Sequence, residues 1–158
     1  MNHLRIQNQK KVESCPLTMR ENDTAVLIID VQETLINQVQ DRDSILFNIR
    51  RLIDASNILR LEKYFTEQNP KKLSGTIDYL LDDKEDKVYS KMDFSCTGCG
   101  LLIEELEKNG CQNILLCGIE THVCVQQTAF DLMAKGFNIF IAIDAVGSRN
   151  ALDHKTAL

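Results

Sequence analysis

Cys124 lies in a sequence pattern that suits a nucleophilic thiol. The apolar run 114–117 ends at Gly118, as expected where a strand turns sharply into a helix. Thr121 is expected to cap that helix, which would place Cys124 in the first turn, beside backbone N–H groups without a helical partner. The positive end of the helix dipole would then lower the pKa of Cys124 below the free-thiol value of about 8.5. The alternative is a small buried side chain, the usual fate of a lone cysteine.

Two further side chains, Asp30 and Lys91, come directly after predicted strands. Ala25–Ile29 is a short continuous apolar run, typical of a strand buried on both faces, and a third strand is expected at 86–90. The carboxyl ends of parallel strands share one edge of a sheet, where ligands bind. We therefore expect Asp30, Lys91 and Cys124 to meet at that edge. Taken singly, the aspartate would more often be a helix cap and the lysine a solvated charge.

The chain alternates predicted strands with predicted helices. Strands are expected at 25–29, 63–66, 86–90, 113–117 and 137–143, and helices from Asp41 or Asp43 to Leu59 and at 76–81, 100–109 and 121–135. This alternation predicts an α/β fold of three α-β-α layers, Rossmann-like, with a mostly parallel sheet. The helix after residue 121 is expected to bury an apolar side formed by Val123, Val125, Ala129, Phe130 and Met133.

Composition describes an ordinary globular protein. The chain has 158 residues, a net charge of −5 and 44% hydrophobic residues. No Lys/Arg-rich block stands out, so nucleic acid is not an expected partner, and the apolar runs are too short to span a membrane. We expect one domain at 23–158, shortened at its carboxyl end because Asp153–Leu158 resembles the start of a capped helix.

Residues 1–22 are expected to form an irregular leader. They contain no apolar segment typical of a secretory signal, so a cytoplasmic location is expected. Arg5, Lys10 and Lys11 come without an acidic residue, which leaves an organelle-targeting signal open. Six cysteines without a secretory signal also indicate a reducing compartment and free thiols.

The other cysteines have structural interpretations. Cys96 and Cys99 form a C-x-x-C pair, but a zinc site would need two more ligands, and a redox pair would normally follow the first strand of a thioredoxin-like unit. We expect this pair to lie in a loop that leads into the helix at 101–109. Cys111 and Cys117 flank or lie in a predicted strand and are expected to pack in the core.

Four segments in order resemble the isochorismatase-like cysteine hydrolases, and most of all the isochorismatase domain-containing proteins. The segments are Thr24–Gln32, Phe65–Pro70, Lys91–Ser95 and Gly118–Thr128, and the similarity runs from about Thr24 to Leu158. The resemblance implies a parallel sheet in the order 3-2-1-4-5-6, which puts the carboxyl ends of strands one and four side by side. Against that pattern, the sixth strand and most of the last helix are missing, so a shortened hydrolase domain is expected at 23–158. It also implies that relatives of this fold commonly form oligomers, so a homo-oligomer is expected.

The resemblance implies a catalytic triad of Asp30, Lys91 and Cys124. Cys124 would attack a carbonyl carbon and form a thioester, while Asp30 would act as general base and then as general acid. Lys91 would hold Asp30 in position. The peptide bond between Ile119 and Glu120 would be cis, and the N–H groups of Glu120 and Cys124 would bind the developing oxyanion.

Two departures from related branches narrow the expected chemistry. The D-x-H metal motif of nicotinamidases has no counterpart between Phe65 and Pro70, so neither a metal nor another cofactor is expected. True isochorismatases lack the nucleophilic cysteine, whereas Cys124 is present here. The sequence thus predicts a metal-independent cysteine hydrolase acting on a small amide-like substrate. The alternative is a catalytically inactive scaffold of the same fold. Glu67 and Gln68 would contact substrate or stabilise the turn that follows them.

Overall fold

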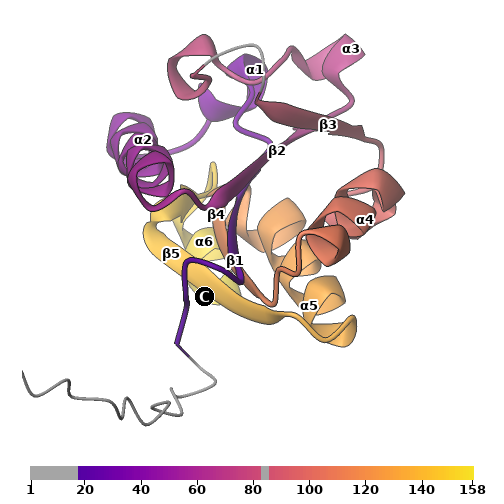
Figure 1. Cartoon of the computed structure of the whole chain (residues 1–158). Helices are drawn as coiled ribbons and strands as arrows, with labels where there is room; N and C mark the ends of the chain where they lie inside the picture. Colours follow the sequence, from indigo (N-terminus) through magenta and orange to yellow (C-terminus); the bar gives the residue numbers. More distant parts are fainter. Residues whose placement is uncertain (1–17, 83–85) are drawn as a thin grey trace, which may run out of the picture.

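Five parallel strands form the centre of the protein, a computed structural model that describes residues 18–82 and 86–158. The strands are β1 (Thr24–Ile29), β2 (Glu62–Gln68), β3 (Lys87–Lys91), β4 (Asn113–Ile119) and β5 (Asn138–Gly147). They lie in the order β3-β2-β1-β4-β5, and each neighbouring pair is parallel (Figure 1). This order is the expected one for these five strands. The expected leader at 1–22, with its basic residues and Cys15, lies outside the described residues up to position 17.

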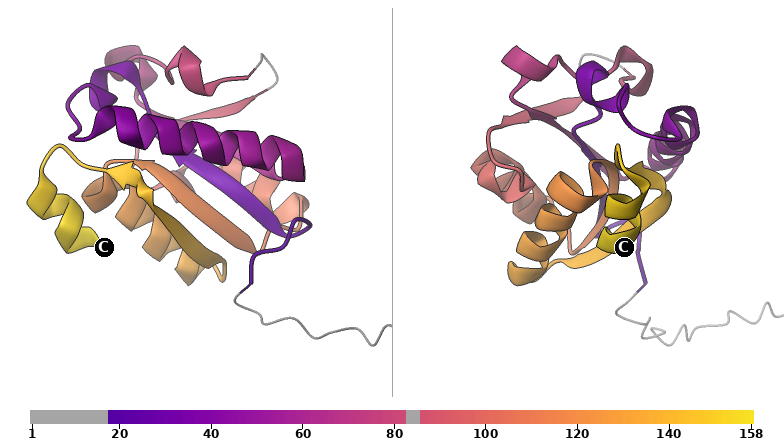
Figure 2. Two further views of the ribbon diagram at one scale, coloured as in Figure 1. Left: turned by 90° about the vertical axis from the view of Figure 1, so that its left-hand side faces the viewer. Right: turned by 180° about the vertical axis from the view of Figure 1, so that it is seen from behind.

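Helices cover both faces of this sheet, so the expected three-layer α/β fold is confirmed (Figures 1 and 2). One face carries α1 (Glu33–Ile36), α2 (Arg42–Leu59) and the 3-10 turn η1 (Asp78–Leu80); the other carries the 3-10 turn η2 (Cys96–Gly98), α4 (Gly100–Lys108) and α5 (Gln126–Ala134). The short helices α3 (Pro70–Leu73) and α6 (Ala151–Ala157) follow β2 and β5. No helix among residues 18–82 and 86–158 is long and apolar enough to cross a membrane.

The apolar run of β1 is buried on both faces because β1 is the central strand. Leu27 and Ile29 pack into the core beneath α4 and α5, whereas Val26 and Ile28 pack into the core beneath α2. Every residue of β1 is buried. An uninterrupted apolar sequence is what such a strand requires. The carboxyl end of β1 is therefore fixed between two neighbouring strands.

Several strands extend further at their carboxyl ends than expected. In the sheet, Gln68 pairs with Lys91 and Ile119 pairs with Gly147, all beyond the apolar runs. Backbone pairing continues where the side chains become polar, and the hydrophobic pattern alone cannot detect these strand residues. Lys91 is therefore the last residue of β3, not the first residue after it.

Helix starts and faces also differ from expectation. Asp41 adopts a left-handed conformation and makes no side-chain cap for α2. The cap of α6 is Asn150, which accepts a hydrogen bond from the Leu152 N–H at 2.9 Å, so the helix begins before Asp153. The expected helix at 76–81 is only the 3-10 turn η1.

The prediction of which side of α5 is buried was also wrong in part. Phe130 and Met133 are 62% and 58% exposed. The stripe that faces the core is Val125, Ala129 and Leu132, and it includes the polar side chain of Thr128. A stripe chosen by hydrophobicity alone misses an inward-facing threonine.

Candidate active site

Asp30 is fixed at the carboxyl end of β1 by the neighbouring strand β2. Its side chain is fully buried, and its backbone has a positive φ of 53°. The Asp30 N–H donates to the Thr66 carbonyl at 3.1 Å, and the Thr66 hydroxyl donates to Asp30 Oδ1 at 2.8 Å. Thr66 thus holds both the backbone and the carboxylate of Asp30. It is a site residue that the sequence analysis missed.

Lys91 satisfies the second oxygen of that carboxylate. Its Nζ lies 2.6 Å from Asp30 Oδ2, and both side chains are inaccessible to solvent. The ammonium also donates to Gln68 Oε1 at 2.8 Å and to the carbonyls of Asp93 and Phe94 at 3.1 and 2.9 Å. Burial on its own would lower the pKa of Lys91, but the Asp30 charge and hydrogen bond outweigh it and raise the pKa. Lys91 is therefore charged inside the core.

Gln68 is held in place by a second glutamine. The Gln68 N–H donates to Gln32 Oε1 at 2.7 Å, and Gln32 Nε2 donates to the carbonyls of Gln68 and Ser74 at 3.1 and 2.6 Å. The structure thus uses Gln68 to support Lys91. Glu67 has a loop role, because its Oε1 accepts the Thr76 N–H at 2.7 Å. Gln32 could have been suspected, since it lies only two residues after Asp30.

The third expected residue, Cys124, lies in the turn that follows β4, residues 120–125, which is called the cysteine turn below. Gly118 has a φ of +115°, and a Cβ at this position would collide with the backbone of Ile29. The peptide bond between Ile119 and Glu120 is cis, as the resemblance implied. The chain then enters the π-helical turn η3 (Thr121–Val125) before α5 begins. Gly118 therefore lets β4 approach the end of β1 closely, which brings the cysteine turn towards Asp30.

The expected cap of the cysteine helix was wrong. Thr121 is the first residue of η3 and makes no cap; its hydroxyl is instead 2.9 Å from His154 Nδ1. The N–H groups of Val123 and Val125 both converge on the Glu120 carbonyl, at 3.1 and 3.2 Å. Cys124 thus lies in a wide turn that precedes α5, not in the first turn of a regular α-helix. Such π turns are frequent at functional sites.

The expected low pKa of Cys124 was also wrong. The residue is only 7% exposed, and burial raises the pKa of its thiol. The charge of Asp30 and a hydrogen bond to it raise the pKa further, while the nearby Lys91 opposes them without prevailing. Desolvation and a facing carboxylate are stronger than the dipole of a helix end. The resting thiol is therefore protonated.

Another buried thiol, Cys96, borders the same site. Its Sγ lies 3.6 Å from the Thr66 hydroxyl, and its N–H donates to Thr128 Oγ1 at 2.9 Å. Burial is the main factor that raises the pKa of Cys96 to about 11. Cys96 and Cys99 are both free and lie in the loop that precedes α4, as expected. Cys111 and Cys117 are buried in the core, also as expected.

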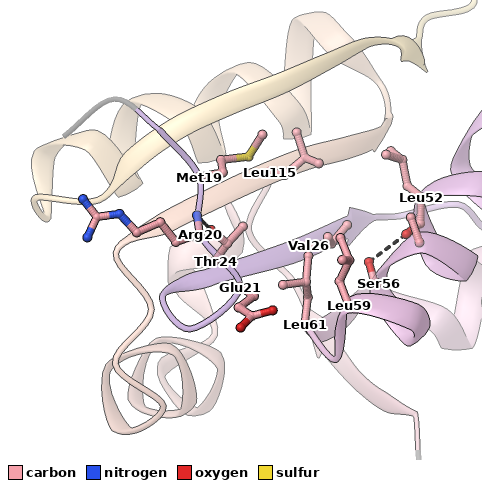
Figure 3. A pocket seen from close by; sticks show the side chains of 11 residues that line it. Met19, Arg20, Glu21, Thr24, Val26, Leu52, Ser56, Leu59, Leu61 and Leu115 are labelled. Atoms are coloured by element: carbon pink, nitrogen blue, oxygen red, sulfur yellow. Dashed lines mark hydrogen bonds between the residues drawn. The ribbon is translucent and has the colours of Figure 1, made fainter. Parts of the chain in front are cut away.

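A cavity of about 510 Å³ lies away from Asp30, Lys91 and Cys124. It opens between the second half of α2 and the amino-terminal part of the sheet, where Leu52, Leu59, Leu61 and Leu115 line it (Figure 3). Asp30 and Lys91 lie at the opposite, carboxyl edge of the strands. Among residues 18–82 and 86–158, no three His, Cys, Asp or Glu side chains are placed to hold a metal ion together.

Comparisons with known proteins agree with this architecture. The family description "Isochorismatase domain" matches residues 24–158. A secreted isochorismatase effector, Isc1, from Phytophthora sojae is 31% identical over 147 residues, which cover 87% of this chain and 68% of that protein. Isochorismatase domain-containing protein 1 from Danio rerio is 34% identical over 134 residues, covering 82% of this chain and 46% of that protein. The chain thus spans less than half of that second relative.

Solved structures show the same fold. A structure described as MAR1 ribonuclease from Caenorhabditis elegans has a TM-score of 0.81 at 36% identity, covering 88% of this chain and 72% of that one. The YcaC gene product of Escherichia coli, described as an octameric hydrolase of unknown specificity, has a TM-score of 0.80 at 23% identity, covering 88% and 71%. The family match over residues 24–158 and these relatives place the chain in the isochorismatase hydrolase family.

Proposed function

We propose that the protein is a metal-independent cysteine hydrolase that cleaves a small amide-like C–N bond through a thioester on Cys124. The observation that carries this proposal is the fully buried ion pair of Asp30 and Lys91, whose carboxylate charge raises the pKa of the Cys124 thiol. A buried carboxylate beside a thiol is a general base beside a nucleophile. Membership of a hydrolase family is consistent with this chemistry.

The first half of the reaction would transfer one proton twice. Cys124 Sγ attacks the amide carbon while Asp30 takes the thiol proton, so that the carbonyl oxygen becomes an oxyanion. The oxyanion then collapses, the C–N bond breaks, and Asp30 passes its proton to the departing nitrogen. The products are a neutral amine or ammonia and an acyl group held as a thioester on Cys124.

The second half would regenerate the thiol. Asp30 takes a proton from water, the hydroxide attacks the thioester carbon, and the thiolate leaves and regains that proton. A carboxylic acid is released. Lys91 would stay charged throughout, since four acceptors surround its ammonium, and would keep Asp30 oriented. The N–H groups of Glu120 and Cys124 would bind the oxyanion, where one donor is typically worth about 2.7–4 kcal/mol.

The raised pKa of Cys124 supports concerted proton transfer. A preformed thiolate next to Asp30 would place two negative charges in a buried site, which burial and Coulomb repulsion oppose. The thiol instead reacts as its proton moves to the carboxylate. This mechanism needs the carboxylate close to the sulfur, and the influence of Asp30 on the pKa of Cys124 fits that need.

RNA is a less suitable substrate for this chain, although the C. elegans structure carries the name of a ribonuclease. Binding to a polyanion depends on clustered Lys and Arg side chains, and this chain has a net charge of −5 with a pI near 5.2. An RNA oligonucleotide is therefore a useful control substrate. Homo-oligomer formation and a cytoplasmic location stay predictions, to be checked by light scattering and by imaging of the tagged full chain.

The test is to incubate the protein with a panel of small primary amides, measure ammonia release, and map any acyl adduct by peptide mass spectrometry. We expect turnover of at least one amide and an adduct on Cys124. Cys124→Ser should abolish both, whereas Cys99→Ser should change neither, since Cys99 is a more exposed thiol directly before α4. An adduct on Cys99 instead, or turnover that survives in Cys124→Ser, would refute the proposal. Absence of any adduct would favour the inactive scaffold.

A further inference from the structure

Three consecutive residues of the cysteine turn, Glu120, Thr121 and His122, contact one later segment of the chain. This segment, Ser148–His154, begins directly after β5 and enters α6; it is called the strap below. Glu120 contacts Arg149, Thr121 contacts His154, and His122 contacts Ser148. Each contact joins the cysteine turn to a residue about 30 positions later in the chain. The turn is thus anchored from outside by the strap.

The strongest of these contacts joins Glu120 and Arg149. Arg149 Nη2 lies 2.7 Å from Glu120 Oε1, and Arg149 Nε lies 3.0 and 3.1 Å from the two carboxylate oxygens. The Arg149 backbone N–H also donates to Glu120 Oε2 at 3.0 Å. The Glu120 side chain is only 12% exposed. Its burial would raise the pKa of Glu120, but the Arg149 hydrogen bonds and charge lower it, so the pair is ionised.

The two neighbouring contacts restrain the turn in the same direction. The Thr121 hydroxyl lies 2.9 Å from His154 Nδ1, and His122 Nδ1 lies 3.0 Å from the Ser148 hydroxyl. The strap begins at a fixed point, because Gly147, the residue before it, pairs with Ile119 in the sheet. Within the strap, Asn150 caps α6. A segment that starts from the sheet and contacts three residues of the turn can restrain the orientation of that turn.

We propose that Arg149 is a positioning residue that holds the Glu120 backbone so that the oxyanion-binding N–H groups stay aimed at the reacting carbonyl. This inference rests on the proposed function, because it assigns the N–H groups of Glu120 and Cys124 to an oxyanion. Bidentate pairing fixes geometry as well as charge, and lysine reproduces only the charge. Arg149 acts through Glu120 and does not touch the reacting atoms.

The test compares two reactions of the same thiol in the full chain. p-Nitrophenyl acetate transfers its acetyl group to Cys124 Sγ and releases p-nitrophenol, and this attack on a carbonyl builds an oxyanion. Iodoacetamide alkylates the same sulfur by displacing iodide from a saturated carbon, and no oxyanion forms. Loss of oxyanion alignment should therefore slow the first reaction and spare the second.

We expect Arg149→Ala to slow acetylation of Cys124 by about tenfold or more, with alkylation within about twofold of the wild-type rate. The acetylation rate of Arg149→Lys should fall between those of the wild type and Arg149→Ala. If Arg149→Ala folds poorly, Glu120→Gln should show the same slow acetylation with nearly unchanged alkylation. The matched control is Arg50→Ala, which removes a bidentate arginine on α2 that pairs with Asp54 and Asp82, remote from the site. It should leave both rates unchanged.

Each result decides something. Equal losses in both reactions for Arg149→Ala and Glu120→Gln would mean a merely structural role and would overturn the inference. Unchanged acetylation would overturn it as well, while leaving the proposed function intact. If the wild-type protein is alkylated but never acetylated at Cys124, the proposed function fails, and the positioning role fails with it.

Discussion

Lys91 Nζ donates a 2.6 Å hydrogen bond to Asp30 Oδ2, although the two residues are 61 positions apart and neither side chain reaches solvent. A buried ion pair is stable only when its remaining donors and acceptors are satisfied. Here Thr66 serves the other carboxylate oxygen, and Gln68 with two backbone carbonyls serves the ammonium. Such a complete network at the carboxyl edge of a parallel sheet holds the Asp30 carboxylate in one orientation.

Replacing Asp30 by Asn should separate thiol ionisation from catalysis. The carboxylate raises the pKa of Cys124 by its charge and hydrogen bond, whereas Lys91 lowers it. In Asp30→Asn the thiolate should therefore form at lower pH, and the pH profile of iodoacetamide alkylation should move down. Hydrolysis of an amide identified in the substrate panel should fall about 10²–10⁴-fold, because the general base and acid are gone.

The matched control for that experiment is Asp54→Asn, a surface carboxylate on α2 that should change neither profile nor turnover. Alkylation rates are to be measured from pH 6 to pH 10 by quantitative peptide mass spectrometry, at steps of about one pH value, since the free thiol titrates near pH 8.5. An alkylation profile that stays in place, or moves to higher pH, would contradict the influence of Asp30 on the thiol.

Removing the Lys91 ammonium should destabilise the fold more than removing a lysine from a partly exposed ion pair would. Lys91→Met leaves the buried Asp30 carboxylate without its counterion, and we expect a loss of about 3–5 kcal/mol in the free energy of unfolding. Asp30→Asn/Lys91→Met removes both charges and should recover most of that loss. Asn also tolerates the positive φ at position 30. The measurement is denaturation in urea.

Lys63→Met serves as the comparison, because Lys63 pairs with Asp82 at 2.7 Å in a partly exposed site. Its loss should be no more than about 1 kcal/mol. The prediction would be contradicted if Lys91→Met and Lys63→Met lost similar amounts of unfolding free energy, or if the double variant were less stable than Lys91→Met. Either result would mean that burial does not make the Asp30–Lys91 pair more important for stability than a partly exposed pair.

Gly118 should tolerate no side chain. A Cβ there would meet the backbone nitrogen and carbonyl of Ile29, which cannot move without separating β1 from β4. Gly118→Ala should therefore lose several kcal/mol or fail to fold. Gly110→Ala is the matched control, because Gly110 also has a positive φ of 67° but open space around it. It should lose only about 1–2 kcal/mol, the cost of a left-handed conformation. Equal thermal stability of the two variants would be the contrary result.

The expected positions of Asp30 and Lys91 follow from a simple topological rule. Parallel strands all end at one edge, so residues at the ends of predicted strands can be brought together without knowing any side-chain contact. Thr66 and Gln68 were harder to find, because they belong to the same edge but are uncharged and only complete the hydrogen bonds of others. Arg149 gave no signal in sequence, since its partner Glu120 lies 29 residues away.

The sequence by itself determined the alternation of strands and helices, the strand at 25–29 that is buried on both faces, and the edge at which the charged residues would gather. These features depend on local hydrophobic pattern and on chain order. Only the tertiary structure decided the protonation of Cys124. That property depends on how much water reaches the sulfur and on which charge faces it, and both are set by packing between distant segments. A local pattern indicated a thiolate; the surrounding core and Asp30 make it a thiol.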